Sequence, residues 1–156
     1  MFTIRYAKEE DNPLILDFIR RLADYEKMSD QVAATEDLIR EWVFEKKKAE
    51  VLLGEEDGKP VAFALFFHNF STFLGRAGIY LEDLFILPEC RGKGYGKVIM
   101  KKLAKIAVER GCGRLEWACL NWNESSLAFY RSLGAEPLTE WTTCRLSGET
   151  LQELAK

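Results

Sequence analysis

The residues best suited to chemistry form the run 91–97, Arg-Gly-Lys-Gly-Tyr-Gly-Lys, in which three glycines alternate with larger residues. The run follows the apolar segment 79–87 and precedes an amphipathic segment. N–H groups in the first turn of a helix have no intrahelical partner, and the helix dipole adds about half a positive charge there. Glycine also lets a ligand approach the backbone closely. With its three basic residues, the run predicts a site for a phosphate or pyrophosphate group.

Two common phosphate loops do not fit this run. A Walker loop needs four residues between its first glycine and the Gly-Lys pair, and a Ser or Thr after that pair, but these two positions hold Arg91 and Val98. The dinucleotide fingerprint G-x-G-x-x-G needs a glycine where the chain has Lys97 or Ile99. The alternative to a ligand site is a glycine-rich strand-to-helix turn with solvated lysines.

A second chemical feature is the acidic pair Glu82 and Asp83, which interrupts the apolar segment 79–87. A carboxylate buried in an apolar strand is costly unless it has a partner. Consecutive strand residues face opposite sides, so the two acids can share a role only if a bulge intervenes. Each acid therefore either acts chemically or forms an ion pair with a core arginine.

The elements that must position these residues follow from periodicity and turn signals. A chain of 156 residues fits a single domain, 1–156. The expected strands are 3–7, 51–54, 61–67, 79–87, 115–120 and one that ends at Arg145-Leu146; a turn at Asp57-Gly58 joins the second and third. The first expected helix begins with Asn12 as its N-cap before Pro13. The second covers residues 35–45, the third follows the glycine run, and a short fourth helix closes the chain. This order predicts a mixed α/β fold, antiparallel at first and followed by a strand–helix–strand crossover.

Composition excludes several classes of protein. The chain has 22 basic and 25 acidic residues and a net charge of −3, which is not the footprint of a nucleic-acid-binding protein. No apolar run approaches the ~20 residues that span a bilayer, and the N-terminus lacks a signal-peptide pattern. Cys90, Cys112, Cys119 and Cys144 show no metal-ligand spacing, and His68 is the only histidine. We expect no metal and no membrane partner, a cytoplasmic location, and a structural role for His68.

Two motifs together resemble the GNAT superfamily of N-acetyltransferases. The first is R-x-x-G-x-G at residues 91–96, which in that superfamily grips the pyrophosphate of coenzyme A. The second runs from Asn123, suited to cap a helix, through the aromatic pair Phe129-Tyr130 to Gly134-Ala135. The resemblance implies a GNAT fold, with a central mixed sheet of six to seven strands flanked by helices. It also implies direct transfer of an acetyl group from acetyl-CoA to an amine in a ternary complex.

Three further segments resemble the spermidine/spermine (diamine) N-acetyltransferase group within that superfamily. They are residues 80–85 (YLEDLF), 22–26 (LADYE) and 122–124 (WNE). This resemblance implies a homodimer whose C-terminal segments help to build the substrate groove. It also implies that the pantetheine arm lies in a V-shaped opening between the strands 79–87 and 115–120. The residues it assigns to coenzyme A are Leu84, Phe85, Ile86, Arg91, Gly92, Lys93, Gly94, Tyr95, Gly96, Lys97, Asn123, Glu124, Ser125, Ser126 and Leu133. Those it assigns to the amine substrate are Tyr25, Glu26, Glu82, Asp83, Glu116, Trp117 and Ala118.

The chemistry of acetyl transfer gives two of these side chains a role. An alkylamine with a pKa of about 10.4 must lose its proton before it attacks, which costs roughly 4–5 kcal/mol at pH 7. We expect Glu82 to accept that proton through a water molecule. By the resemblance, Tyr130 donates a proton to the departing thiolate; its alternative role is packing against Leu127 and Leu133.

One departure from the diamine group bears on the substrate. The polyamine enzymes carry an acidic residue, Gly and Trp directly before the arginine of the final strand, whereas residues 142–144 here are Thr-Thr-Cys before Arg145, with Glu140 and Trp141 earlier. The loss of that carboxylate favours a shorter amine, such as thialysine or a small diamine. Glu26 is expected to contact the amine. The alternative is that Glu26 and the pair Glu36-Asp37 form a solvated acidic face. The alternative functions are acetylation of an amino acid or protein amine, and acyl-CoA sensing without turnover.

Overall fold

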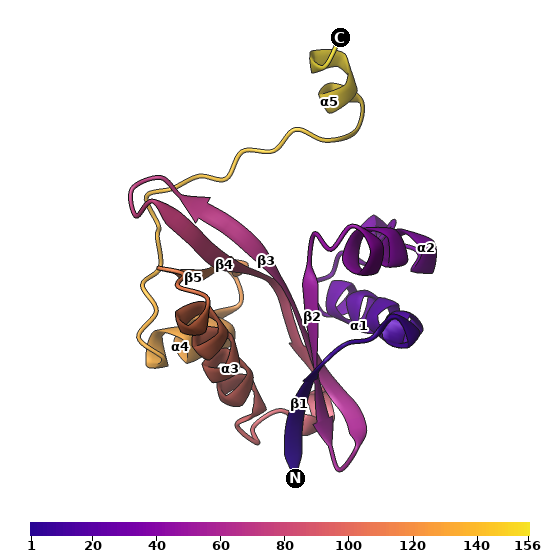
Figure 1. Ribbon diagram of the computed structural model, residues 1–156, viewed down its shortest axis with the longest axis vertical. Coiled ribbons are helices and arrows are strands. Elements are labelled where there is room, and N and C mark those ends of the chain that lie inside the picture. Colours follow the sequence, from indigo (N-terminus) through magenta and orange to yellow (C-terminus); the bar gives the residue numbers. More distant parts are fainter. The chain divides into compact units, whose positions relative to one another are not determined.

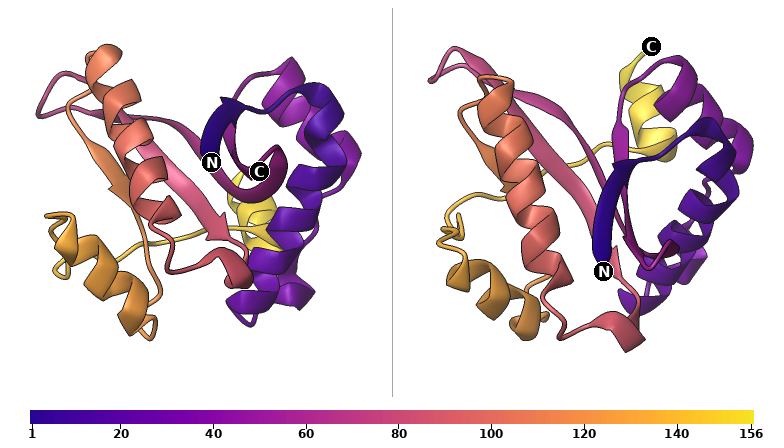
Figure 2. Two further views of the ribbon diagram at one scale, coloured as in Figure 1. Left: turned by 90° about the horizontal axis from the view of Figure 1, so that it is seen from below. Right: turned by 60° about the horizontal axis from the view of Figure 1, so that its bottom comes forward.

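The computed structural model describes all residues from 1 to 156. The chain divides into two compact units, residues 1–118 and 119–156, and each is described by itself. The first unit holds a five-stranded sheet in the order β1-β2-β3-β4-β5, with α1 and α2 on one face and α3 on the other (Figures 1 and 2). Its strands are β1 (Phe2–Tyr6), β2 (Glu50–Glu56), β3 (Lys59–Ser71), β4 (Arg76–Ile86) and β5 (Leu115–Trp117).

The helices of the first unit are α1 (Asn12–Tyr25), α2 (Glu36–Ile39), its π-helical continuation η3 (Arg40–Glu45) and α3 (Tyr95–Glu109), with short 3₁₀ turns at Glu9–Asp11, Ser29–Gln31 and Pro88–Cys90. The second unit holds α4 (Glu124–Ser132) and α5 (Gly148–Leu154). No helix of the structure combines the length and the apolar character that a membrane span requires.

Strands β1 to β4 form an antiparallel meander, and β5 joins β4 in parallel after the α3 crossover. The predicted hairpin turn between β2 and β3 is confirmed, because Asp57 and Gly58 have φ angles of 51° and 81°. A two-residue hairpin turn needs positive φ at both positions, which Asp-Gly tolerates well.

The face of the sheet toward α1 carries one core. Ile15, Phe18 and Leu22 of α1 are buried at helical spacing. Phe18 stacks on Phe63 of β3 with ring centroids 5.3 Å apart and meets the edge of Phe85 of β4 at 6.4 Å. Burial of each such side chain contributes about 1.5–3 kcal/mol, so α1 is fixed against β3 and β4.

The opposite face packs against α3. Ile99, Leu103 and Ile106 are buried, while Lys101 and Lys105 are exposed. The amphipathic pattern of this helix is therefore confirmed, and its N-terminus lies directly after the glycine run.

A bulge interrupts β4 at Glu82. Asp83 pairs with Leu65 of β3, but Leu81 pairs with the next β3 residue, Phe66, so Glu82 is an additional residue in β4. Residues directly opposite in an antiparallel pair share a face. Leu65 packs against the α1 core, so Asp83 faces α1, whereas Leu81, two positions earlier, faces α3. The bulge that the two acids need in order to share a face is present.

The pairing of β4 with β5 is short. Its last pair is Leu81 with Trp117, although β4 continues to Ile86. Beyond the bulge, the β4 edge that faces β5 therefore has no strand partner.

Two local predictions are wrong, and a third, the helix 35–45, is confirmed with a change of helix type. Asp11, not Asn12, precedes α1 as its N-cap; Asn12 is inside the helix and buried, and its Nδ2 donates to the carbonyl oxygen of Glu36 at 2.7 Å. The expected helix 35–45 begins with Thr35 as N-cap but is α-helical only to Ile39 and then becomes a π-helix. The strand expected to end at Arg145-Leu146 does not form.

The sheet consequently has five strands instead of the expected six to seven, although the mixed α/β class is confirmed. Strand β5 ends at Trp117 instead of Leu120. A strand of only three residues offers little edge for another strand to pair with, and Pro137 lacks the N–H that a ladder needs.

Candidate active site

The glycine run forms a left-handed turn that leads into α3. Gly92 and Gly94 have φ angles of 80° and 83°, and Gly94 is the N-cap of the helix. A Cβ atom at either position would meet nothing within 4 Å, so the backbone conformation demands glycine and the space beside it is open. The N–H of Val98 bonds to the carbonyl oxygen of Gly94 at 3.3 Å. The N–H groups of residues 95–97 precede that bond, as an anion site at a helix start requires.

The basic side chains of the run differ in their contacts. The Nε of Arg91 donates to the carbonyl oxygen of Ile86 at 3.1 Å, and its guanidinium lies 4.6 Å from the ring centre of Tyr25. Lys93 forms an ion pair with Glu56 at 3.1 Å, whereas Lys97 is exposed. Arg91 thus connects the run to both β4 and the end of α1.

Tyr95, the aromatic residue of the run, packs against the first strand. Its ring stacks on Phe2 with centroids 4.0 Å apart and planes 9° from parallel. This stacking fixes the first turn of α3 against β1.

Three carboxylates lie close together where β4 bulges. Burial, followed by the negative charges of Glu82 and Glu26, raises the pKa of Asp83 to about 7. Burial and then the charge of Glu82 also raise the pKa of Glu26. No arginine or lysine offsets either shift, so the alternative of an ion pair with a core arginine does not apply to Asp83. A cluster of like charges without a counterion attracts a cationic ligand.

Glu116 belongs to the same face of the sheet. It pairs in register with Tyr80 of β4, and Asn69 of β3 donates from Nδ2 to its Oε1 at 3.2 Å. Burial, followed by the charges of Glu82 and Glu116, raises the pKa of Tyr80. Tyr80 therefore lies between the bulge carboxylates and Glu116.

The first unit thus brings together most of the residues expected to bind substrate. Tyr25 and Glu26 lie at the end of α1, beside Arg91 and the acidic bulge. Tyr80 lies between the bulge and Glu116. Trp117 is the last residue of β5, and Ala118 directly follows that strand. Sequence reasoning missed Tyr80 and Asn69. A signal for Asn69 was available in Gly78, since glycine inside a strand often marks the close approach of another group.

The second unit contains the remaining expected residues on one short helix. Asn123 is the N-cap of α4, and its Oδ1 accepts hydrogen bonds from the N–H of Ser126 and the hydroxyl of Ser125, each at 3.3 Å. Gly134 has a φ of 91° just after the helix. Both predicted caps are confirmed. Tyr130 contacts the ring of Phe129 at 5.4 Å, and the N–H of Leu133 bonds to the Tyr130 carbonyl oxygen at 3.1 Å.

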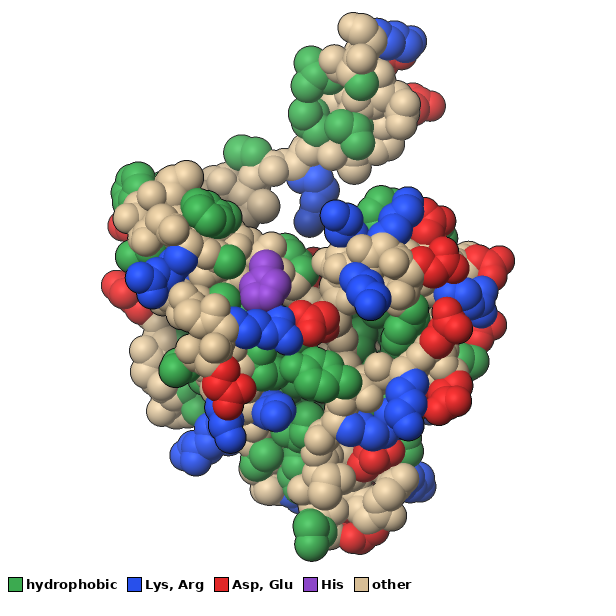
Figure 3. Space-filling model, viewed as in Figure 1, with side chains coloured by type: hydrophobic (Ala, Val, Ile, Leu, Met, Phe, Trp, Pro, Cys, Tyr) green, Lys and Arg blue, Asp and Glu red, His purple; other side chains and the backbone are tan.

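His68 is held by polar contacts outside these sites. Its Nε2 lies 2.9 Å from Arg110, which can only donate, so Nδ1 carries the proton and donates to the carbonyl oxygen of Gly78 at 3.0 Å. Arg110 also forms a bidentate pair with Glu50 at 2.7 and 2.9 Å. In Figure 3, His68 is the one purple side chain and lies beside basic and acidic neighbours. These contacts agree with the expected structural role.

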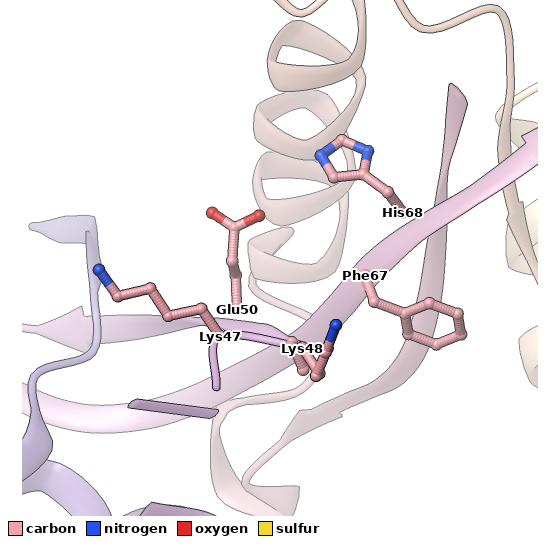
Figure 4. A pocket seen from close by; sticks show the side chains of 6 residues that line it. Lys47, Lys48, Glu50, Phe67 and His68 are labelled. Atoms are coloured by element: carbon pink, nitrogen blue, oxygen red, sulfur yellow. The ribbon is translucent and has the colours of Figure 1, made fainter. Parts of the chain in front are cut away.

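A pocket opens beside His68, and none of the residues that line it belongs to the glycine run. It is lined by Lys47, Lys48, Ala49, Glu50, Phe67 and His68 (Figure 4). None of these residues was expected to bind coenzyme A or the amine, and the pocket holds no member of the carboxylate cluster.

The first unit combines a mixed sheet whose parallel pair ends early, a glycine-capped helix that follows β4, and acids at the point where β4 and β5 separate. The sequence profile of the Acetyltransferase (GNAT) family matches residues 16–135. The chain belongs to this family and is an acetyltransferase.

Relatives of known activity and a solved structure agree with this assignment. The chain is 43% identical to the thialysine N-epsilon-acetyltransferase of Bos taurus, over 97% of this chain and 96% of that protein. It is 31% identical to the spermidine/spermine N(1)-acetyltransferase-like protein 1 of Homo sapiens, over 99% of this chain and 24% of that protein. The structure of an integron cassette protein from V. cholerae matches with a TM-score of 0.82 and 31% identity, covering 99% of this chain and 98% of that one.

Proposed function

We propose that this acetyltransferase moves the acetyl group of acetyl-CoA to a primary amine of a small polyamine, diamine or thialysine-like molecule. The observation that carries the proposal is the cluster of Glu26, Glu82 and Asp83, in which no arginine or lysine offsets the raised pKa of Asp83. A cation that enters this cluster restores the charged forms of the acids, so an alkylammonium fits it well. The names of the relatives, thialysine and spermidine/spermine acetyltransferases, support the same class of substrate.

The residues proposed to hold acetyl-CoA fit a thioester carrier with a diphosphate. The open N–H groups at residues 95–97 and the exposed Lys97 face solvent at the start of α3, and would neutralise the diphosphate. The β4 edge at Leu84, Phe85 and Ile86 has no β5 partner. The Ile86 carbonyl oxygen accepts from Arg91, and the other backbone groups of this edge are proposed to pair with the amides of the pantetheine arm. The resemblance adds residues 123–126 and Leu133 of the second unit to this set.

Glu82 is proposed as the base and as an anchor for the amine. As the extra residue of a bulge, it lies beside Asp83 and Tyr80. It accepts a proton from the bound ammonium through a water molecule, and the free amine nitrogen then attacks the thioester carbon. A C–N bond forms, the C–S bond breaks, and Tyr130 gives its proton to the sulfur that leaves. The second proton lost by the attacking nitrogen, as the amide forms, restores the Tyr130 hydroxyl.

We further propose that the protein acts as a cytoplasmic homodimer. Its four cysteines are all free thiols, as is usual in a reducing compartment. The dimer rests on the resemblance to the diamine acetyltransferase group.

The test of the proposed function is release of coenzyme A thiol from acetyl-CoA with spermidine, putrescine, thialysine, lysine and a peptide that carries a free α-amine. We expect turnover with at least one of the small amines and none with the peptide. Turnover confined to the peptide would contradict the proposed substrate class and favour acetylation of a protein amine.

A further inference from the structure

One carboxylate at the end of β2 contacts the segment that leads from β4 into α3 at three points. Glu56 accepts hydrogen bonds from Nζ of Lys93 with both of its oxygens, each 3.1 Å away. The Sγ of Cys90, directly before the glycine run, donates to Oε2 at 3.6 Å. The hydroxyl of Tyr95, in the first turn of α3, donates to the same carboxylate. Glu56 thus holds the run before, within and near the end of its glycines.

The strand register places Glu56 beside the aromatic contact of Tyr95. Phe2 of β1 pairs with Glu56, and residues directly opposite in an antiparallel pair share a face. The Phe2 ring stacks on Tyr95 with centroids 4.0 Å apart. The same ring lies across Gly54, because a Cβ atom there would lie 2.5 Å from its Cζ. The paired ends of β1 and β2 therefore support the start of α3 with one aromatic ring and one carboxylate.

The two lysines of the run differ in whether they are free to bind a ligand. The hydrogen bond from Lys93 lowers the pKa of Glu56, and the bond to Glu56 raises the pKa of Lys93, so both groups are charged at neutral pH. Lys97 is exposed and forms no ion pair within the chain. Lys97 can therefore approach a diphosphate directly, whereas Lys93 would first have to leave Glu56.

The glycines make the run dependent on contacts from outside it. Gly92 and Gly94 have positive φ angles, and glycine loses more conformational freedom on folding than any other residue. A loop that other residues already hold in its bound conformation loses less entropy when a ligand binds. An isolated exposed ion pair contributes little, but here three contacts share one carboxylate and act on the segment that presents the open N–H groups.

We propose that Glu56 is a positioning residue for coenzyme A, which holds the glycine run so that the N–H groups of residues 95–97 face the diphosphate. Lys93 acts through Glu56 and does not contact the diphosphate itself. The inference rests on the proposed function, since it assumes that coenzyme A binds at the run. It removes Lys93 from the direct ligands that the resemblance implies and adds a residue of another strand that no motif marks.

Calorimetric titration with coenzyme A is the test, because it requires no amine. Glu56→Gln keeps the size of the side chain and an oxygen that accepts from Tyr95, but it removes the ion pair with Lys93. We expect the Kd for coenzyme A to rise about twofold to fivefold, the upper range for an exposed ion pair. The KM for acetyl-CoA should rise by the same factor while kcat stays the same, a separation that loss of folded protein does not produce.

Lys93→Met and the double variant decide how Lys93 acts. Lys93→Met should raise the Kd by a similar factor, and the variant with both substitutions should bind no more weakly than the weaker single variant, because the two side chains act as one unit. A lysine that contacts the diphosphate gives the opposite pattern. Glu56→Gln would then free Lys93 and lower the Kd, and adding Lys93→Met would weaken binding again.

Glu55→Gln is the matched control. It removes the same charge from the neighbouring residue, whose ion pair is with Arg5 and not with the run, so its Kd should equal that of the wild type. Thermal melting shows that each variant is folded. An equal rise in Kd for Glu55→Gln and Glu56→Gln would overturn the positioning role, since the effect would then follow the charge alone.

The remaining outcomes separate this inference from the proposed function. If the wild-type protein binds coenzyme A and Glu56→Gln binds it equally or more tightly, the role of Glu56 is wrong and the proposed function stands. Weaker binding by Glu56→Gln without acetylation of any small amine would support the role of Glu56 and contradict the proposed substrate class. If the wild-type protein binds no coenzyme A, the proposed function fails and takes this inference with it.

Discussion

The guanidinium of Arg91 lies 4.6 Å from the ring centre of Tyr25, and the Nε of the same arginine donates to the carbonyl oxygen of Ile86. One side chain of the glycine run thus contacts both the end of α1 and the end of β4. Because Glu26 follows Tyr25 directly, this contact joins the proposed diphosphate site to the proposed amine site.

Tyr25→Ala should therefore weaken the binding of coenzyme A, although Tyr25 is proposed to contact the amine. An exposed cation–π contact contributes about 0.5–1 kcal/mol, so we expect a Kd for coenzyme A about twofold to fivefold higher by calorimetry. Tyr25→Phe keeps the ring and should bind coenzyme A like the wild type. Equal binding by all three proteins would show that the contact does not support the site.

The raised pKa of Asp83 predicts an unusual dependence of stability on pH. The pKa is about 7 in the folded protein, against an ordinary value of 3.8, so the folded state holds an additional proton between these two values. Stability contributed by this residue is full below about pH 4 and is lost as the pH rises through 7. The loss is at most about 4 kcal/mol.

Asp83→Asn removes this dependence and is the variant to compare. Relative to the wild type, its free energy of unfolding should increase from pH 5 to pH 8, as measured by urea denaturation at each pH. Asp11 and Glu50, whose pKa values are lowered by Arg5 and Arg110, act in the opposite direction in both proteins and cancel in the comparison. A constant difference across this range would mean that Asp83 titrates normally.

Tyr130→Phe tests the proposed general acid. Loss of a general acid typically lowers turnover about 10²- to 10⁴-fold, and the ring contact with Phe129 remains in this variant. Steady-state kcat with a saturating amine is the measurement, and Tyr6→Phe in β1 serves as a matched loss of a phenol hydroxyl. Unchanged kcat would remove Tyr130 from the mechanism.

Gly94→Ala should damage the diphosphate site through the backbone alone. With φ at 83° and no atom within 4 Å of a new Cβ, the cost is that of a left-handed alanine, about 1–2 kcal/mol. We expect lower stability and a KM for acetyl-CoA several-fold higher. Gly58→Ala in the β2–β3 hairpin, with φ of 81° and equal space, carries the same backbone cost and should leave that KM unchanged; a similar rise in both would point to general destabilisation.

Local signals were sufficient for the parts of the site that local structure builds. The glycines of residues 92–96, the N-cap Asn123 and the turn at Asp57-Gly58 are each recognisable because a few neighbouring residues determine the backbone there. The same reasoning misplaced the cap of α1, since the choice between Asp11 and Asn12 depends on a hydrogen bond to Glu36, far along the chain.

Features that depend on strand register could not be predicted in this way. From the sequence, Glu82 and Asp83 could share a role only if β4 contained a bulge. The position of that bulge is known only from the pairing of Asp83 with Leu65 and of Leu81 with Phe66. The bond from Asn69 to Glu116 joins residues on strands that are not neighbours in the sheet, and no pattern within either strand reveals it.

The bulge makes this enzyme sensitive to chain length as well as to residue type. Deletion of the residue at position 82 would make Leu81 and Asp83 consecutive opposite Phe66 and Leu65, which removes the bulge and leaves both side chains on their present faces. A point substitution at position 82 keeps the extra residue and the local bend of the strand. Libraries that aim to alter the acceptor preference of this scaffold should therefore hold the number of residues between Leu81 and Leu84 constant.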